Sequence, residues 1–170
     1  MPLPISHGFL GATLVAAIHP KINKFYAFPL LIGGFLANAA DFDFLFVFAA
    51  QDPSWHRAFS HSILFSGLVF FGLAAYLGKE RMRESLAYGL AYFSHVWLDY
   101  LTTRSGGGLE LFWFFSAKKL KLGLFGLSEE PLKMPFFELL QALGIEALIF
   151  GSLFAAVYRL KGRFGTDRIA

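Results

Sequence analysis

The sequence contains no cysteine and few charged residues. Without cysteine, the chain has no disulfide framework and no thiolate zinc site. Charged residues make up 16% of its 170 residues, against roughly 25% in an ordinary soluble domain. The net charge is only +3. We therefore expect neither a disulfide-rich secreted domain nor a nucleic-acid-binding protein, which would need a strongly basic surface.

Apolar residues, by contrast, are abundant. They make up 56% of the chain, phenylalanine alone occurs 22 times, and the mean hydropathy is +0.54. Disorder is excluded, because disordered chains are polar and poor in aromatic residues. A soluble fold of this size cannot bury so much apolar surface. The composition is typical of a membrane protein.

Four long apolar runs divide the sequence, and a shorter run precedes them. The long runs cover residues 26–50, 61–78, 85–103 and 136–158, and the short run covers residues 4–18. A helix of about 20 residues crosses the hydrocarbon layer of a membrane, which is roughly 30 Å thick. The pattern therefore predicts an all-α fold, a polytopic membrane helix bundle with four to five transmembrane helices.

We expect one membrane-embedded domain over residues 1–170, a multi-pass protein of the cell inner (plasma) membrane. Residues 104–135 form its one long connection. This stretch holds an aromatic cluster followed by lysines, and it is predicted to lie on the membrane surface. Basic residues are slightly more frequent in the loops on the side of the C-terminal tail, which favours a cytoplasmic tail. The oligomeric state stays open.

Helices that cross the membrane in alternating directions would bring polar residues of these runs, and of the loop at residues 51–60, toward one face. Those residues are His7, Asp41, Asp43, His56, Arg57, His61, His95 and Asp99. A charged aspartate at the centre of a bilayer costs about 2.5–3.5 kcal/mol. A cationic partner must offset this cost, and the candidates are Arg57, Arg104 and a metal ion.

The spacing of the aspartates along the sequence indicates which of them could bind a cation. His95 and Asp99 are four residues apart, so they share one helix face and can hold one cation between them. Taken alone, such a pair is more often a simple hydrogen bond. Asp41 and Asp43 are two residues apart and face different ways on a helix. One of them is predicted to bind metal, and the other to orient a histidine or to mark a helix break.

Two histidines lie where the loop at residues 51–60 meets the run 61–78. His56 and His61 are five residues apart, so they share a face only if a helix begins between them. Asp52 and Pro53 predict a short capped turn, and Ser60 is predicted to cap the next helix. In that arrangement both imidazoles can turn toward one centre.

Together these residues predict a catalytic centre for a divalent metal. Oxygen and nitrogen ligands without sulfur suit zinc, or else manganese or iron. The predicted ligands are His7, Asp41, His56, His61, His95 and Asp99, which is enough for one or two ions. Asp41 and Asp43 are the predicted catalytic carboxylates, one of which takes the proton of a metal-activated water. Arg57 is predicted to bind an anionic substrate such as a phosphate.

Two further ionisable residues are not assigned to this centre. His19 lies at the opposite end of the first run, beside Pro20. Glu146 lies near the middle of the last run and is expected to pair with a polar group across the bundle.

The motifs resemble those of a known family, the YdjM-like, inner-membrane-associated metal-dependent hydrolases, also described as LexA-binding. The resemblance rests on His7-Gly8, Asp41-Phe42-Asp43, His56-Arg57-Ala58-Phe59-Ser60-His61-Ser62, His95-Val96-Trp97-Leu98-Asp99 and the aromatic segment 112–116. This chain has Ala40 where the family commonly has proline, and Ser60 where it usually has threonine.

The resemblance implies hydrolysis at a metal centre in the inner membrane. A more distant similarity to zinc-dependent phospholipase C implies a phosphoester or lipid-like substrate, and so a membrane lipid as partner. Two alternatives stay open. Intramembrane aspartate and histidine also line the pathways of cation or proton transporters. The description as LexA-binding implies a non-catalytic membrane regulator that binds a cytosolic partner.

Overall fold

The computed structural model describes residues 2–20, 22, 27–104, 107–124, 126 and 133–165, and the side chains within these ranges up to residue 162. The main helices are α1 (Pro4–Ile18), α2 (Phe28–Leu36), α3 (Phe44–Ala50), α4 (Ile63–Leu77), α5 (Met82–Thr102) and α6 (Phe136–Gly165). Short 3-10 helices join some of them: η1 (Ala39–Asp43), η2 (Pro53–Trp55), η3 (Phe59–His61) and η4 (Lys79–Arg81). Within the described residues one isolated bridge, between Leu109 and Leu120, is the only β-type pairing. The predicted all-α fold is confirmed.

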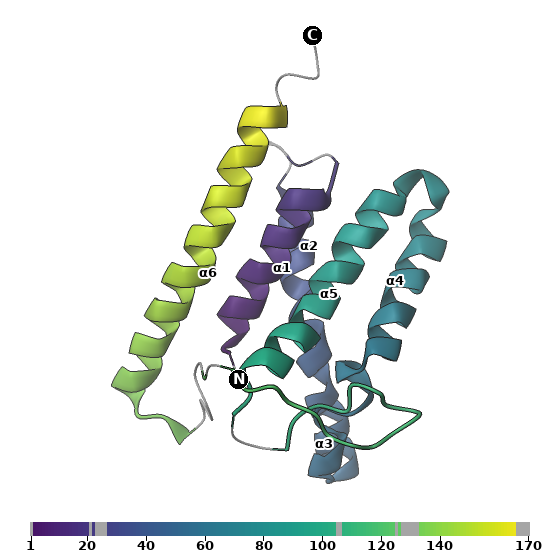
Figure 1. Cartoon of the computed structure of the whole chain (residues 1–170), viewed down its shortest axis with the longest axis vertical. Helices are drawn as coiled ribbons and strands as arrows, with labels where there is room; N and C mark the ends of the chain where they lie inside the picture. Colours follow the sequence, from purple (N-terminus) through teal and green to yellow (C-terminus); the bar gives the residue numbers. More distant parts are fainter. Residues whose placement is uncertain are drawn as a thin grey trace.

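The helices run up and down and form one bundle (Figure 1). α1 and α5 lie at its centre, α2 packs against both, α4 packs against α5 at one edge, and α6 packs along α1 at the other edge. The start of α1, the whole of α3 and the end of α5 lie at the lower end in this view. The alternation brings residues from distant parts of the chain to that lower end.

The long apolar run 26–50 is not one straight helix. α2 ends at Leu36, η1 follows, and α3 leaves at 49° to α2. The break forms although position 40 is alanine and not proline. Asn38 explains why the helix ends here, because its Nδ2 donates to the Gly34 carbonyl oxygen at 2.8 Å and so competes with the helical hydrogen bonds.

The predicted start of the next helix is wrong by two residues. Ser62, not Ser60, caps α4, and its Oγ accepts a hydrogen bond from the Phe65 amide at 3.0 Å. Ser60 lies in η3 instead, and its hydroxyl donates to Asp43 Oδ2. Asp52 does cap a short turn as predicted, by accepting from the Ser54 amide.

Glycines allow α1 and α2 to approach closely. A Cβ atom on Gly11 would lie 2.4 Å from the Gly33 carbonyl oxygen, and one on Gly33 would lie 2.5 Å from Val15 Cγ2. Gly8 and Gly34 meet in the same way, at 3.3 Å from Cβ to carbonyl oxygen. Small residues that let backbones touch are typical of helix pairs in membranes. This contact holds the start of α1 beside the end of α2.

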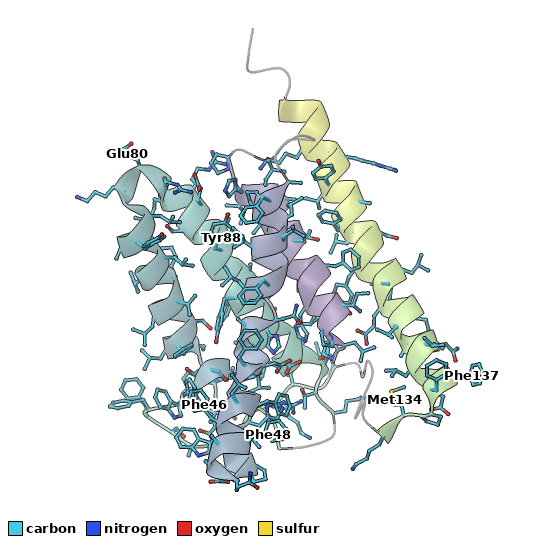
Figure 2. All side chains as sticks on the ribbon, turned by 180° about the vertical axis from the view of Figure 1, so that it is seen from behind. Phe46, Phe48, Glu80, Tyr88, Met134 and Phe137 are labelled. Carbon is cyan, nitrogen blue, oxygen red and sulfur yellow. The ribbon has the colours of Figure 1, made fainter. Side chains whose placement is uncertain are left out.

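The outer surface of the bundle is strongly apolar. Figure 2 shows side chains such as Phe46, Phe48 and Phe137 turned outward, and Phe48 and Phe137 are 72% and 82% exposed. By length and composition α6 can cross a membrane, and up to three spans result if each bent helix pair counts as one. The four to five spans predicted from the sequence are thus met only in part.

α5 shows why a hydropathy criterion identifies fewer membrane-spanning helices than the apolar runs of the sequence predict. It has 21 residues, enough to cross a bilayer, yet it carries many polar side chains. Those side chains are buried against α1, α2 and α4, as Ser85, Ser94 and His95 illustrate. A helix surrounded by protein does not need an apolar surface.

Candidate metal centre

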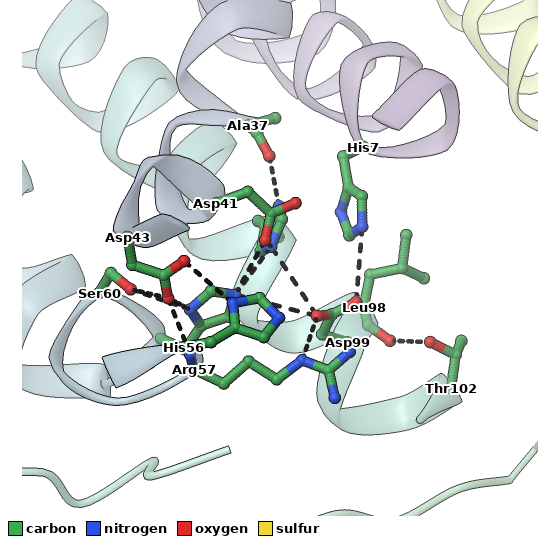
Figure 3. A network of polar contacts seen from close by, with 12 residues as sticks. His7, Ala37, Asp41, Asp43, His56, Arg57, Ser60, Leu98, Asp99 and Thr102 are labelled. Atoms are coloured by element: carbon green, nitrogen blue, oxygen red, sulfur yellow. Dashed lines mark hydrogen bonds and ion pairs between the residues drawn. The ribbon is translucent and has the colours of Figure 1, made fainter. Parts of the chain in front are cut away.

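The lower end of the bundle holds a cluster of histidines and aspartates (Figure 3). His7 comes from the first turns of α1, Asp41 and Asp43 from η1, and His95 and Asp99 from α5. The segment between α3 and α4 supplies the remaining members, which are His56, Arg57 and His61. The structure thus brings together all the residues that the sequence predicted for the site.

Four of these side chains point their ligand atoms at one small volume. His61 Nε2 and His95 Nε2 lie 3.1 Å apart. Asp41 Oδ1 lies 3.5 Å from the first nitrogen and 3.4 Å from the second. Asp99 Oδ2 lies 3.9 Å from each. Ligand atoms that hold one Zn²⁺ tetrahedrally at 2.0–2.1 Å lie about 3.3 Å apart. The atoms of Asp41, His61 and His95 have this spacing, and Asp99 Oδ2 lies somewhat farther from the two histidines; we call these four atoms the cage.

Hydrogen bonds fix the direction of both imidazole lone pairs. His95 Nδ1 lies 2.7 Å from the Ala37 carbonyl oxygen, which only accepts, so this nitrogen carries the proton. His61 Nδ1 lies 3.3 Å from Asp43 Oδ2 and 3.0 Å from Ser60 Oγ. In the neutral rings both Nε2 atoms then carry lone pairs, and two lone pairs 3.1 Å apart repel unless a cation lies between them.

Several polar atoms around the cage lack a hydrogen-bond partner. These buried atoms are His7 Nδ1 and Nε2, Asp41 Oδ1, and both carboxylate oxygens of Asp99. Buried polar atoms without partners are rare and costly. The charges also favour a bound cation. Three carboxylates face one arginine, and a divalent cation would balance the excess negative charge. The donor set therefore fits a divalent metal ion.

Asp43 organises the part of the cluster next to the cage. It is 2% exposed. Its Oδ1 lies 3.0 Å from His56 Nδ1, and its Oδ2 accepts from the Arg57 amide at 2.8 Å and from Ser60 Oγ at 3.0 Å. With both oxygens engaged, Asp43 orients His56 and His61.

Arg57 has an unusual backbone, with φ of 62°. This left-handed conformation is uncommon for a residue with a side chain. It is held from both sides, because the Arg57 amide donates to Asp43 and its carbonyl accepts from the Glu110 amide at 3.0 Å. The conformation turns the side chain toward the cage, where Nε lies 3.8 Å from Asp99 Oδ2.

His7 lies beside the cage on α1. Its Nε2 is 3.5 Å from Asp99 Oδ1, and its ring stacks on that of His95 with the ring centres 3.9 Å apart. His7, His95 and Asp99 form a second group that could hold a cation, and Asp41, Asp43 and His56 form a third. The groups share members, so the geometry is compatible with one or two ions.

Glu146 of α6 fixes the position of His7 along the bundle. Its Oε2 accepts from the Leu3 amide at 2.8 Å and from Ser6 Oγ. Both donors lie at the start of α1, immediately before His7. The expected polar partner of Glu146 is thus the N-terminal end of α1.

Sequence reasoning missed three contributors to the cluster. The Ala37 carbonyl is open to His95 because the helix breaks there, which no residue type reveals. Ser60 was assigned to a helix cap but binds Asp43. Tyr92 Oη donates to the Ser60 carbonyl at 2.8 Å. Tyr92 precedes His95 by three residues, so its helix face was a usable signal.

His19 lies at the other end of the bundle, away from the cluster, as predicted. Its Nε2 is 3.4 Å from Glu84 Oε2, and Glu84 also pairs with Arg81. Burial lowers the pKa of His19, and the nearby Glu84 carboxylate partly opposes this shift. The side chains of the apolar core, such as Val15 and Ala87, lie between the two polar ends.

Fold and site together define an all-helical protein with at least one helix able to cross a membrane and a buried histidine–aspartate cluster able to hold a cation. The chain belongs to the YdjM inner membrane protein family, whose model matches residues 1–166. This finding confirms the family that the motifs indicated and supports an inner membrane location. No curated protein and no solved structure matches the chain significantly.

Proposed function

We propose that this protein is a metal-dependent hydrolase of the inner membrane that acts on a phosphoester carried by a membrane lipid. The observation that carries the proposal is the four-atom cage of Asp41, His61, His95 and Asp99. The proposed ion is zinc, with manganese or iron as alternatives, and His7 and His56 complete the ligand set if a second ion binds.

A bound divalent cation would acidify a water molecule and stabilise the negative charge that builds up on a phosphoryl oxygen. Arg57 is placed to bind the other phosphoryl oxygens, since its guanidinium lies beside the cage, with Nε 3.8 Å from Asp99 Oδ2. The side chain of Arg57 is 12% exposed and that of Asp41 is 19% exposed, so both lie where a substrate can reach them.

The two predicted catalytic carboxylates have different roles in this proposal. Asp41 accepts the proton from water as the water oxygen bonds to phosphorus, and the proton then passes to the ester oxygen when the phosphorus–oxygen bond breaks. Asp43 is engaged at both oxygens, so it acts by orienting His56 and His61. The products are an alcohol and a phosphate monoester, or free phosphate.

We further propose that the chain crosses the membrane four to five times. The spans are α1, the bent pair α2–α3, α4, α5 and α6, with α1 and α4 as the shortest at 15 residues each. The apolar outer faces of these helices support this arrangement. All of the cage residues then lie toward one membrane surface, on the side at which α1 begins and α5 ends.

The separation of the two polar ends favours hydrolysis over transport. A cation or proton path needs polar groups through the bundle, and an apolar cluster that includes Val15, Ala16 and Ala91 lies between the cage and His19. The regulator hypothesis is untested. It gains support if purified protein binds metal but hydrolyses no phosphoester.

Metal analysis of purified protein tests the proposal. We expect protein purified in detergent at neutral pH without chelators to contain about one or two equivalents of a divalent metal, as the overlapping ligand groups allow. His61→Ala and His95→Ala/Asp99→Ala should lose most of it, together with hydrolysis of bis(p-nitrophenyl) phosphate.

His19→Ala is the matched control, because His19 is equally buried and also faces a carboxylate, but at the other end of the bundle. It should keep the metal content of the wild type. Wild-type protein that neither contains metal nor takes up added Zn²⁺, Mn²⁺ or Fe²⁺ would refute the proposal.

A further inference from the structure

An apolar groove lies beside the cluster, between the broken helix and α4. α2 and α4 both pack against α5, which leaves a space between them with Tyr92 of α5 at its floor. Phe42 and Phe46 line one wall, and Phe65 and Val69 line the other. Its volume is about 320 Å³, within the range of roughly 300–1,000 Å³ of small-molecule pockets.

The chemistry of the groove selects an apolar occupant. Its walls are almost entirely apolar, so water inside it would find few hydrogen-bond partners. The helices that frame it expose large apolar side chains outward, such as Phe48 at 72% and Leu68 at 56%. In a membrane the mouth of the groove therefore faces hydrocarbon chains.

One part of the groove wall is shared with the candidate metal centre. Asp43 and Ser60 line the groove, both side chains contact His61, and Asp43 also accepts from the Arg57 amide. An extended molecule in the groove would thus have one end beside the polar cluster and the other among lipid chains.

We propose that this groove binds the hydrocarbon chain of the lipid substrate whose phosphate binds at Arg57 and the cage. This inference rests on the proposed function and specifies its substrate class as a phosphoester with a long alkyl or acyl chain. The groove provides selectivity, because a short or chainless phosphoester leaves it unfilled.

Photolabelling tests this proposal. Protein is reconstituted into vesicles of phosphatidylethanolamine and phosphatidylglycerol that contain some phosphatidylglycerol with a diazirine in its acyl chain. We expect labels to concentrate on groove residues such as Phe65 and Val69 rather than on the outward face of α6. Dodecyl phosphate should compete, and inorganic phosphate should compete much less.

Groove variants test whether the labelling depends on the groove. Val69→Trp fills it and should reduce groove labelling by about tenfold. Leu68→Trp is the matched control, because Leu68 is the neighbouring residue on α4 but does not line the groove, and it should label like the wild type. Leu45→Trp fills the groove from the opposite wall and keeps the test valid if Val69→Trp does not fold.

Arg57→Gln tests whether the lipid chain in the groove belongs to a lipid bound at the candidate metal centre. If the labelled chain belongs to a lipid whose phosphate binds Arg57, this variant should also lower groove labelling by about tenfold. Unchanged labelling in Arg57→Gln, or uniform labelling of all outward faces in the wild type, would overturn the inference.

Metal content in the same samples separates this inference from the proposed function. If all the groove variants retain metal but the photolabel is not concentrated on the groove residues, the inference is overturned and the proposed function stands. Metal absent from the wild type removes the proposed function, and the inference falls with it.

Discussion

Asp43 holds three separate parts of the candidate centre through its two carboxylate oxygens. It contacts the His56 ring, the Arg57 amide and the Ser60 hydroxyl, and it lies 3.3 Å from His61 Nδ1. A carboxylate that orients a metal-binding imidazole also makes it a better ligand. Asp43 should therefore matter to metal binding although it does not border the cage.

We predict that Asp43→Asn lowers the affinity for the cation by about 10–100-fold, the usual cost of losing a group that orients a ligand. The amide keeps one acceptor but cannot satisfy all the donors that meet the carboxylate. Competition with a chelating dye measures the affinity. Asp52→Asn is the control, since Asp52 is exposed and its pKa is lowered only by the Ser54 hydrogen bond. Equal affinities for the two variants would contradict the role of Asp43.

The membership of the cluster could be predicted, but its internal hydrogen bonds could not. His95 and Asp99 share a helix face whatever surrounds them, and alternating helices bring His7 to the same end. The partner of His95 is a main-chain carbonyl at Ala37, which is open only because the helix ends there. Such contacts arise from the tertiary structure, which residue types alone do not determine.

At the scale of elements, the glycine contact between α1 and α2 sets the position of His7. The two helices meet where Gly11 faces Gly33, four residues beyond His7 on α1. Glu146 adds a second constraint by binding the start of α1 from the other side. α1 therefore cannot slide or turn without moving His7 away from Asp99.

We predict that Gly11→Ala destabilises the fold by about 1–3 kcal/mol, because its new Cβ atom would lie 2.4 Å from the Gly33 carbonyl oxygen. The two helices would have to move apart. Gly67→Ala on α4 is the control, as its Cβ atom would meet nothing within 4 Å and alanine favours helix by up to about 1 kcal/mol. Unfolding in detergent by SDS titration gives both values, and a neutral Gly11→Ala would argue against the close contact.

Element boundaries show a similar division between what the sequence determines and what it does not. α1 runs over the residues of its predicted run, because Pro4 suits the first turn and Pro20 cannot continue the helix. α4 begins later than predicted: Ser60 lies within the 3-10 helix η3, with its hydroxyl directed at Asp43, and Ser62 is the cap. Two serines near one helix start look alike in sequence, and the tertiary structure decides between them.

At the scale of the whole molecule, the number of spans is the main open prediction, and α5 is its most informative case. The absence of cysteine makes the test direct, because single-cysteine variants have no background. Glu80 precedes α5 and Ser116 follows it, and both are exposed. We predict that Glu80→Cys and Ser116→Cys react with a membrane-impermeant maleimide from opposite sides of the membrane.

Gln51→Cys supplies the matched control, since Gln51 lies before α4 and should be labelled from the same side as Ser116→Cys. Labelling of Glu80→Cys and Ser116→Cys from one side would show that α5 does not cross. The hydropathy of the isolated helix cannot decide this point, because the protein around α5 satisfies its polar groups.

The central place of α5 also bears on how the protein reaches its membrane. In the proposed arrangement α5 leaves the ribosome after α1, α2–α3 and α4 have been made. The groups that meet Asp99 and His95 are therefore already present when this poorly apolar segment arrives at the insertion machinery. The order of synthesis thus supplies the polar partners before the helix that depends on them, so α5 can enter the bilayer as part of a hairpin with α4 rather than alone.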